Sequence, residues 1–274
     1  MKKILSFFII IFFVAELPGQ AVRSPVAARY IGLGAYTMNH VDVFSFTSNQ
    51  ASLARLKNIT AGVYGEKRFL LSAVNLYSAV IALPTVKGNF GIQADYFGFK
   101  NYQESQIGFA YARNLGKKLD VGIKFNYYSS RIPGYGNASA LDFEIGLIAH
   151  LSEKLHTGIH VYNPVGGRFS KLDNEKLSSA YTFGMGYDAS ERFFVSAEIV
   201  KEEGKPVNVN TGFQYNFMKQ FFVRAGIATE TTNSYAGAGL KWNYFRLDLT
   251  GSYHPQLGFT PGILVIADIK PGQE

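Results

Sequence analysis

Three histidines in one short stretch are the residues of this sequence that could most readily do chemistry. His150, His156 and His160 have even spacing, so in a β-hairpin they would share one face, with His150 and His156 on either side of a tight turn. Zinc and copper sites need convergent imidazoles of this kind, usually completed by a carboxylate. The lumen face of a water-filled barrel is also where ordinary polar side chains belong. We expect this second role, with no metal and no other cofactor.

Nucleophilic catalysis has less support in the sequence. A serine hydrolase needs Ser, His and Asp or Asn brought together, and the chain contains no Gly-x-Ser-x-Gly element. Ser152 is close to His150 in sequence, but we expect it in a turn. We identify no catalytic residue and expect a protein that is not an enzyme.

The first 20 residues have the three parts of a secretory leader. A basic start with two lysines precedes an apolar segment from Ile4 to Ala15, and residues 16–20 form a short polar stretch. The apolar segment is shorter than the roughly 20 residues that span a bilayer as a helix, so we interpret residues 1–20 as a signal peptide. Because the chain has no cysteine, a lipidated-cysteine anchor, disulfides and thiolate metal sites are excluded.

Composition indicates a β-protein that passes through the export route. The chain has 17 Tyr, 23 Phe and 28 Gly, and no later segment approaches 18 consecutive apolar residues. This combination is typical of an outer-membrane barrel or a secreted β-protein. The formal net charge of +7 comes from scattered residues without a basic cluster, so we expect no nucleic-acid partner.

From about Asn58 onward the sequence alternates with a period of two. In residues 119–127 the odd positions are Leu, Val, Ile, Phe and Tyr, and the even positions are Asp, Gly, Lys and Asn. Residues 139–151 and 206–217 repeat the pattern. A helix would instead repeat its apolar residues every three or four positions, so the pattern predicts strands.

The alternation predicts 14 strands, with 12 as the alternative count. A tilted transmembrane strand takes about 9–11 residues, which fits the spacing of these segments. The expected strands are 58–67, 70–84, 89–99, 104–115, 118–130, 139–151, 154–162, 178–188, 192–201, 206–217, 219–229, 234–243, 244–253 and 260–269.

Short and long connections alternate between these segments. Tight turns at 86–89, 115–119 and 151–155 contrast with longer polar stretches at 130–139 and 163–178. Outer-membrane barrels have short periplasmic turns and longer external loops, and aromatic residues at their interfaces. We therefore expect a barrel in the outer membrane of a Gram-negative cell, and an even strand count places both termini in the periplasm.

A membrane explains the two faces better than a water-soluble core does. Apolar strand faces need a common apolar medium, and lipid provides it while the polar faces line a lumen. Closure also removes the unpaired sheet edges that bilayers do not tolerate. We expect several charged residues to face this lumen, together with many glycines that leave room inside. The charged set is Asp95, Asp120, Lys124, Asp142, Glu144, Glu198, Arg224, Lys241, Arg246 and Asp248.

The segment before the strands could fill that room. It contains Gly32-Leu33-Gly34-Ala35-Tyr36-Thr37, then Asp42 and Ser45, then residues 49–54, which read Asn-Gln-Ala-Ser-Leu-Ala. This series resembles the amino-terminal hatch of FadL/PorV-like outer-membrane proteins, in which G-x-G-G-A-Y-T-A precedes D, S and N-P-A-G-L-A. The chain lacks the proline of the last element and has Ser52 in place of its glycine.

The resemblance implies four parts: a signal peptide (1–20), an N-terminal hatch or plug (21–56), an outer-membrane β-barrel (57–270) and a C-terminal tail (271–274). It also implies hatch contacts or ligand-binding residues, which we expect to be Gly32, Gly34, Tyr36, Asp42, Phe44 and Asn49. The fold class that we predict is all-β, a 14-stranded antiparallel transmembrane barrel with a hatch in the lumen.

Two functions fit this architecture. The first is a PorV/PorQ-like docking or accessory component of protein secretion of the type IX kind, with a protein of the secretion machinery as partner. The alternative is a FadL-like transporter of a hydrophobic small molecule, with the hatch as the moving element. Leu33, Met38, Val41 and Phe46 could then line an apolar pocket with Tyr36 and Phe44. Outer-membrane lipids surround the barrel in both cases.

Overall fold

The computed structural model describes residues 33–71, 74–134, 136–167, 177–229 and 233–269. The expected signal peptide, the first part of the expected hatch and the C-terminal tail lie outside the described residues. No helix in the described part of the chain is long and apolar enough to cross a membrane.

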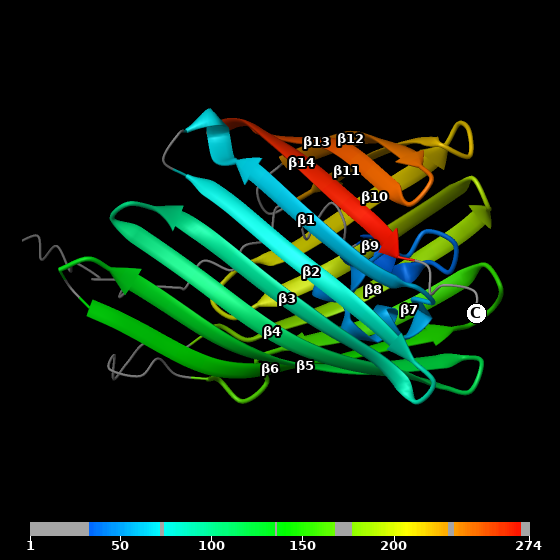
Figure 1. Cartoon of the computed structure of the whole chain (residues 1–274), viewed down its shortest axis with the longest axis horizontal. Helices are drawn as coiled ribbons and strands as arrows, with labels where there is room; N and C mark the ends of the chain where they lie inside the picture. Colours follow the sequence, from blue (N-terminus) through cyan, green and yellow to red (C-terminus); the bar gives the residue numbers. More distant parts are fainter. Residues whose placement is uncertain (1–32, 72–73, 135, 168–176, 230–232, 270–274) are drawn as a thin grey trace, which may run out of the picture.

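Fourteen antiparallel strands form a closed barrel in which each strand pairs with its neighbours in sequence (Figure 1). The barrel closes where β1 pairs with β14, with Ile59 opposite Ile269. The strands are β1 (Ile59–Lys67), β2 (Asn75–Thr85), β3 (Gly88–Phe99), β4 (Tyr102–Leu115), β5 (Leu119–Ile132), β6 (Gly136–His150), β7 (Leu155–Tyr162), β8 (Ala180–Ser190), β9 (Phe193–Glu202), β10 (Val207–Asn216), β11 (Phe221–Ala228), β12 (Asn233–Trp242), β13 (Phe245–His254) and β14 (Gly258–Ile269).

The count of 14 and the all-β fold class are confirmed, but two connections differ from the prediction. The loop expected at 130–139 is mostly strand, because pairing between β5 and β6 continues until Ile132 lies opposite Gly136. The strand expected to begin at residue 70 begins at Asn75. It is preceded by the short 3₁₀ turn η4 (Arg68–Leu70), in which Phe69 has φ of 54° and Leu70 of 58°. A left-handed backbone cannot continue a strand.

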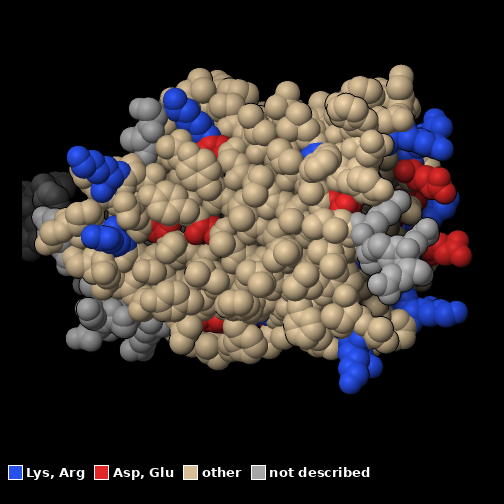
Figure 2. Space-filling model, viewed as in Figure 1, with Lys and Arg blue, Asp and Glu red and all other residues tan. Residues whose placement is uncertain are grey.

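The two faces of the wall are inverted relative to a soluble protein. On β5 and β6, Phe125 and Leu141 are 58% and 72% exposed outward, whereas Lys124 and Glu144 are each 1% exposed inside. Figure 2 shows a broad surface along the barrel that is interrupted by only a few acidic patches, with most of the visible Lys and Arg side chains at its two ends. Such an outer wall requires an apolar medium, as expected of a transmembrane barrel.

Residues 33–56 lie inside this barrel, and we call them the plug. They contain three short 3₁₀ turns, η1 (Leu33–Tyr36), η2 (Ser45–Thr47) and η3 (Gln50–Arg55), drawn in blue in Figure 1. The turn η3 contacts β3 to β6, and η1 contacts β7 to β10. The plug therefore touches both sides of the wall near the end that carries the short turns.

Candidate functional site: the plug and the wall that holds it

Glycines in the wall make room for the plug. A Cβ added at Gly184 would lie 2.1 Å from the Tyr36 ring, and one added at Gly186 would lie 1.9 Å from the Tyr36 carbonyl oxygen. Both glycines face inward on β8, as the alternation predicts. Because any larger residue would overlap Tyr36, these two positions fix where the first turn of the plug can lie.

The same arrangement recurs around the barrel. A Cβ at Gly122 would lie 2.5 Å from the carbonyl carbon of Gln50, and one at Gly146 would lie 2.3 Å from Asn49 Oδ1. A Cβ at Gly212 would lie 2.3 Å from Leu33 Cδ1. The glycines that predict an open lumen are thus largely the contact surface of the plug.

One side of the plug is apolar. Val43, Phe44, Phe46 and Leu53 have 0–2% exposed surface. They pack against inward residues of the wall, and the residues that contribute to this cluster from β1, β2, β4 and β14 are Tyr64, Leu76, Val80, Ala82, Ala110, Ala112, Leu264 and Ile266. Full burial of a side chain of this size contributes about 1.5–3 kcal/mol.

A carboxylate holds the middle of the plug to β11 and β13, next to the apolar cluster. Asp42 Oδ2 accepts hydrogen bonds from Arg246 Nη1 at 2.8 Å and from Arg224 Nη2 at 3.4 Å. Arg246 also bonds to Asp248 on its own strand. Burial alone would raise the pKa of Asp42, but Arg246 and Arg224 outweigh it and hold this pKa below its usual value. Asp42 is therefore ionised and holds the plug to the wall through ion pairs.

Amide side chains join the third turn to β6 and β7. Asn49 Nδ2 donates to the carbonyl oxygen of Ile159 at 3.2 Å, while its Oδ1 accepts from Ala51 N and caps η3. Gln50 Nε2 donates to Glu144 Oε2. Glu144 also pairs with Lys124 at 2.8 Å. These bonds satisfy polar groups that would be costly to bury alone.

Two of the three histidines lie in a chain of bonds between the wall and the plug. His150 Nδ1 lies 2.9 Å from His156 Nδ1, and their Nε2 atoms face Asp120 at 2.8 Å and Asp188 at 3.2 Å. Arg55 binds Asp120 at one end of this chain of bonds, and Thr37 binds Asp188 at the other.

His160 lies on the same face of β7 as His156, four residues further along, and has a different carboxylate partner. Its Nε2 lies 2.8 Å from Glu144 Oε2. Among the described residues, no three His, Cys, Asp or Glu side chains converge in a way that could hold a metal ion. The histidines instead have carboxylate partners that also hold the plug.

His40 is a buried titratable residue of the plug. Its ring stacks on Phe194 with centroids 4.8 Å apart, and its Nδ1 lies 3.0 Å from Gln214 Nε2. Burial lowers the pKa of His40 to about 4, although Asp188 opposes the shift. Burial also raises the pKa of the Tyr36 hydroxyl well above its usual value. Both side chains are therefore neutral near pH 7.

The expected site residues all fall on the plug where the structure describes them. Gly34, Tyr36, Asp42, Phe44 and Asn49 are within hydrogen-bonding or packing distance of the wall or of neighbouring plug turns. Gly32 lies outside the described residues. Whether any of these residues binds a ligand stays a prediction.

Sequence reasoning missed the plug residues Thr37, His40, Gln50 and Arg55, all of which bond to the wall. For Arg55, which lies four residues before β1, its charge within the expected hatch was the available signal. Of the expected pocket residues, Leu33 and Phe46 are buried against the wall, whereas Met38 is 38% exposed.

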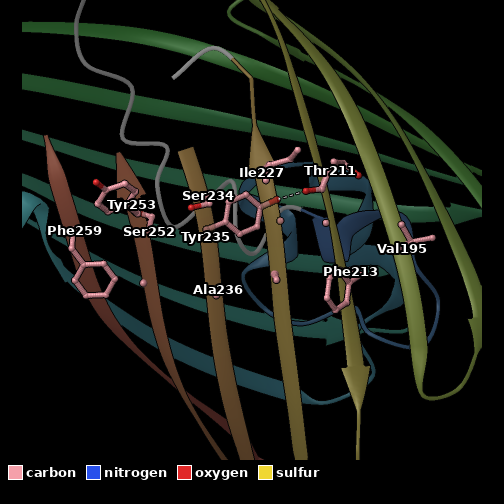
Figure 3. A pocket seen from close by; sticks show the side chains of 14 residues that line it. Val195, Thr211, Phe213, Ile227, Ser234, Tyr235, Ala236, Ser252, Tyr253 and Phe259 are labelled. Carbon is pink, nitrogen blue, oxygen red and sulfur yellow. Dashed lines mark hydrogen bonds between the residues drawn. The ribbon is translucent and has the colours of Figure 1, made fainter. Parts of the chain in front are cut away.

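The outer wall also carries an apolar groove of about 590 Å³ across β9 to β14 (Figure 3). Small residues form its floor, among them Ala225, Ala236 and Gly251, which lie opposite one another on successive strands. Phe259 covers Gly251, where an added Cβ would lie 2.6 Å from the ring. Behind the groove, Tyr235 donates a hydrogen bond to the carbonyl oxygen of Thr211 at 3.1 Å.

No family model and no curated protein matches the sequence. Solved structures do resemble the fold. The Pseudomonas putida toluene transporter TodX has a TM-score of 0.63 at 11% identity, covering 88% of this chain and 95% of that chain. A Pseudomonas aeruginosa FadL homologue has a TM-score of 0.60 at 12% identity, covering 87% and 98%.

The Ralstonia pickettii toluene transporter TbuX is similar as well, with a TM-score of 0.59 at 12% identity, covering 88% of this chain and 96% of that chain. At such low identity the likeness concerns the fold alone. It agrees with the FadL-like part of the resemblance, and nothing in it singles out PorV or PorQ. The fold of this chain is similar to that of FadL-like outer-membrane channels.

Proposed function

We propose that this protein lets a hydrophobic small molecule cross the outer membrane and that the plug is the element that moves. The observation that carries the proposal is the plug itself, which occupies the lumen with side-chain contacts to both sides of the wall. A barrel whose lumen is occupied by a plug passes no molecule unless the plug is displaced. The similarity to two toluene transporters supports the class of cargo by analogy of fold.

The polar contacts support a plug that can be released. Replacing a buried ion pair with apolar residues of similar volume is often neutral or stabilising, so a permanent filling gains little from Asp42, Arg224 and Arg246. Charged and amide side chains can instead exchange their partners for water when a plug moves. This favours a gate over a fixed filling.

The secretion-docking hypothesis stays a prediction. No contact or surface in the described residues favours a protein of the secretion machinery over another partner. The expected outer-membrane location, with both termini in the periplasm, is part of the transport proposal.

A disulfide between plug and wall tests the proposal, because the native chain has no cysteine. Val43 Cγ1 lies 3.1 Å from the position of a Cβ at Gly62 on β1. This is close to the roughly 3 Å between Cβ of one cysteine and Sγ of the other that disulfide dimensions require. We therefore choose the double variant Val43→Cys, Gly62→Cys, in which the edge of the Phe44 ring must turn aside.

Uptake of radiolabelled toluene and of oleate should be measured in Gram-negative cells that produce this variant. We expect uptake of at least one probe to be lost under oxidising conditions and restored by a reductant. The single variant Val43→Cys is the control, and its uptake should not respond to the reductant. Equal uptake by the oxidised and reduced double variant, with the disulfide verified by mass, would refute a moving plug.

A further inference from the structure

Five of the six short turns of the barrel carry an exposed basic side chain. The turn between β2 and β3 has Lys87, and the turn between β4 and β5 has Lys117 and Lys118. Three further turns of this end have Lys154, Arg192 and Lys219, and Lys57 and Arg113 lie at the same end, all of them exposed. We call these residues the basic ring.

Few acidic residues balance the ring. Among the described residues of the short turns, Glu153 and Glu191 are the exposed acidic ones. Basic side chains project from this end of the molecule in Figure 2. Because the charges occur at five of the six turns, the positive potential follows most of the circumference of the barrel and is not confined to one side.

An aromatic belt lies directly beside the ring. Trp242 and Tyr244 are 73% and 52% exposed, and Phe217, Phe221 and Phe90 are about half exposed on the neighbouring strand ends. Exposed aromatics of this kind mark the level at which hydrocarbon gives way to lipid headgroups. Lys and Arg side chains one turn further out can extend to that level while their stems cover apolar surface.

We propose that the basic ring binds the headgroups of anionic phospholipids in the leaflet at the short-turn end. A protein partner would touch one arc of the barrel, whereas annular lipid touches all of it, and the charges follow the lipid pattern. A Lys or Arg near an anionic membrane surface contributes about 1 kcal/mol, which corresponds to a preference of about five-fold per residue.

Trp242 makes the proposal measurable, because it is the single tryptophan of the chain and lies within the belt. The full-length protein is reconstituted into phosphatidylcholine vesicles that contain increasing fractions of brominated phosphatidylglycerol or, in parallel, brominated phosphatidylcholine. Bromine quenches tryptophan only at short range. We expect phosphatidylglycerol to quench at a several-fold lower mole fraction in low salt, and high salt to reduce this preference.

Two matched variants distinguish a local effect of the basic ring from a general effect of net charge. Lys219 lies on the turn next to Trp242, since Lys241 N, directly before Trp242, donates to the carbonyl oxygen of Gln220, directly after Lys219, at 2.7 Å. The variant Lys219→Gln should lower the preference for phosphatidylglycerol several-fold. Lys67→Gln, at the opposite end, should leave it unchanged.

Equal quenching by both lipids in the native protein at low salt would overturn the proposal. An equal loss in the two variants would overturn it as well, because it would show a long-range charge effect and no local ring. A loss confined to Lys219→Gln supports the assignment.

Discussion

The plug contacts the barrel differently on its two sides. Toward β14, β1, β2 and β4 the contact is apolar, and Phe44 and Phe46 are packed among aliphatic and aromatic side chains. Toward β5 to β8, β11 and β13 it consists of ion pairs and amide hydrogen bonds, as at Asp42 and Asn49. Both sides share one feature, which is glycine in the wall at several of the closest contacts, such as Gly62 and Gly186.

This difference indicates that the two kinds of contact have separate roles in docking the plug. Apolar packing is non-directional and supplies affinity in proportion to buried area. Hydrogen-bonded charges contribute less net stability but accept only one arrangement, so they fix how the plug is seated. If so, changes on the apolar side should cost more docking free energy than changes on the polar side, except where a wall glycine is lost.

The largest effect should come from filling the space that a glycine leaves. In Gly186→Ala the new Cβ overlaps the backbone oxygen of Tyr36, which no change of rotamer can relieve. We expect a loss of plug docking above about 4 kcal/mol. Hydrogen exchange of the plug amides of Ser52 and Leu56 would measure it.

The matched control is Gly65→Ala on β1, where the nearest atom would be Cδ1 of Tyr77 at 3.3 Å. Its exchange rates should stay close to native. Native exchange in Gly186→Ala would show that the plug does not lie where the structure places it.

On the apolar side, Phe46→Ala removes a ring that is 0% exposed. We expect a loss of about 3–5 kcal/mol in plug docking, because the cavity adds to the lost transfer free energy. Phe217→Ala, a 55% exposed position on the outer wall, is the control for loss of an aromatic ring. A loss below ~1 kcal/mol in Phe46→Ala would contradict the idea that the apolar side supplies most of the affinity.

On the polar side, Asp42→Asn removes the charge shared by Arg246 and Arg224. We expect a loss of about 2–3 kcal/mol in plug docking. This is less than for a fully broken buried pair, because Arg246 keeps its bonds to Asp248. Adding Arg224→Leu to this variant should recover part of the loss, since one unpaired buried charge is then removed. A larger loss in the double variant would show that Arg224 also acts elsewhere.

The smallest effect should be the pH dependence from His40. With a docked pKa of about 4 and an ordinary value of 6.5, the displaced plug binds a proton that the docked plug does not. Docking is therefore fully stable above pH 6.5 and weakens as pH falls towards 4, by about 2 kcal/mol at pH 5. Hydrogen exchange of the Ser52 amide, measured at pH 5 and at pH 7.5, would show this weakening. In His40→Gln the difference between the two pH values should be smaller.

The wall can be predicted from sequence because a period of two decides both the element and its face. The alternation in 119–127 predicts that Lys124 and Asp120 face the lumen, and both are buried inside the barrel. The loop expected at 130–139 was wrong for a physical reason. Strands that extend beyond the membrane into water carry polar residues, so their composition is that of a loop.

Less of the plug could be predicted from the sequence. Its motif pointed to Asp42 and Asn49, but the partners Arg246 and Ile159 lie far away in sequence, and no local period encodes pairing across a lumen. The wall glycines carried the usable signal, because repeated inward glycine has no purpose in a strand unless another backbone approaches closely.

The most direct test of a lumen closed by the plug is the ion conductance of a barrel that lacks it. A chain without residues 21–54 should still assemble into a heat-modifiable barrel, because strand pairing begins at Ile59. In planar bilayers we expect its conductance to exceed that of the full-length protein, since the plug occupies the lumen. Equal conductance of the two proteins, with assembly verified, would contradict the claim that this segment closes the barrel.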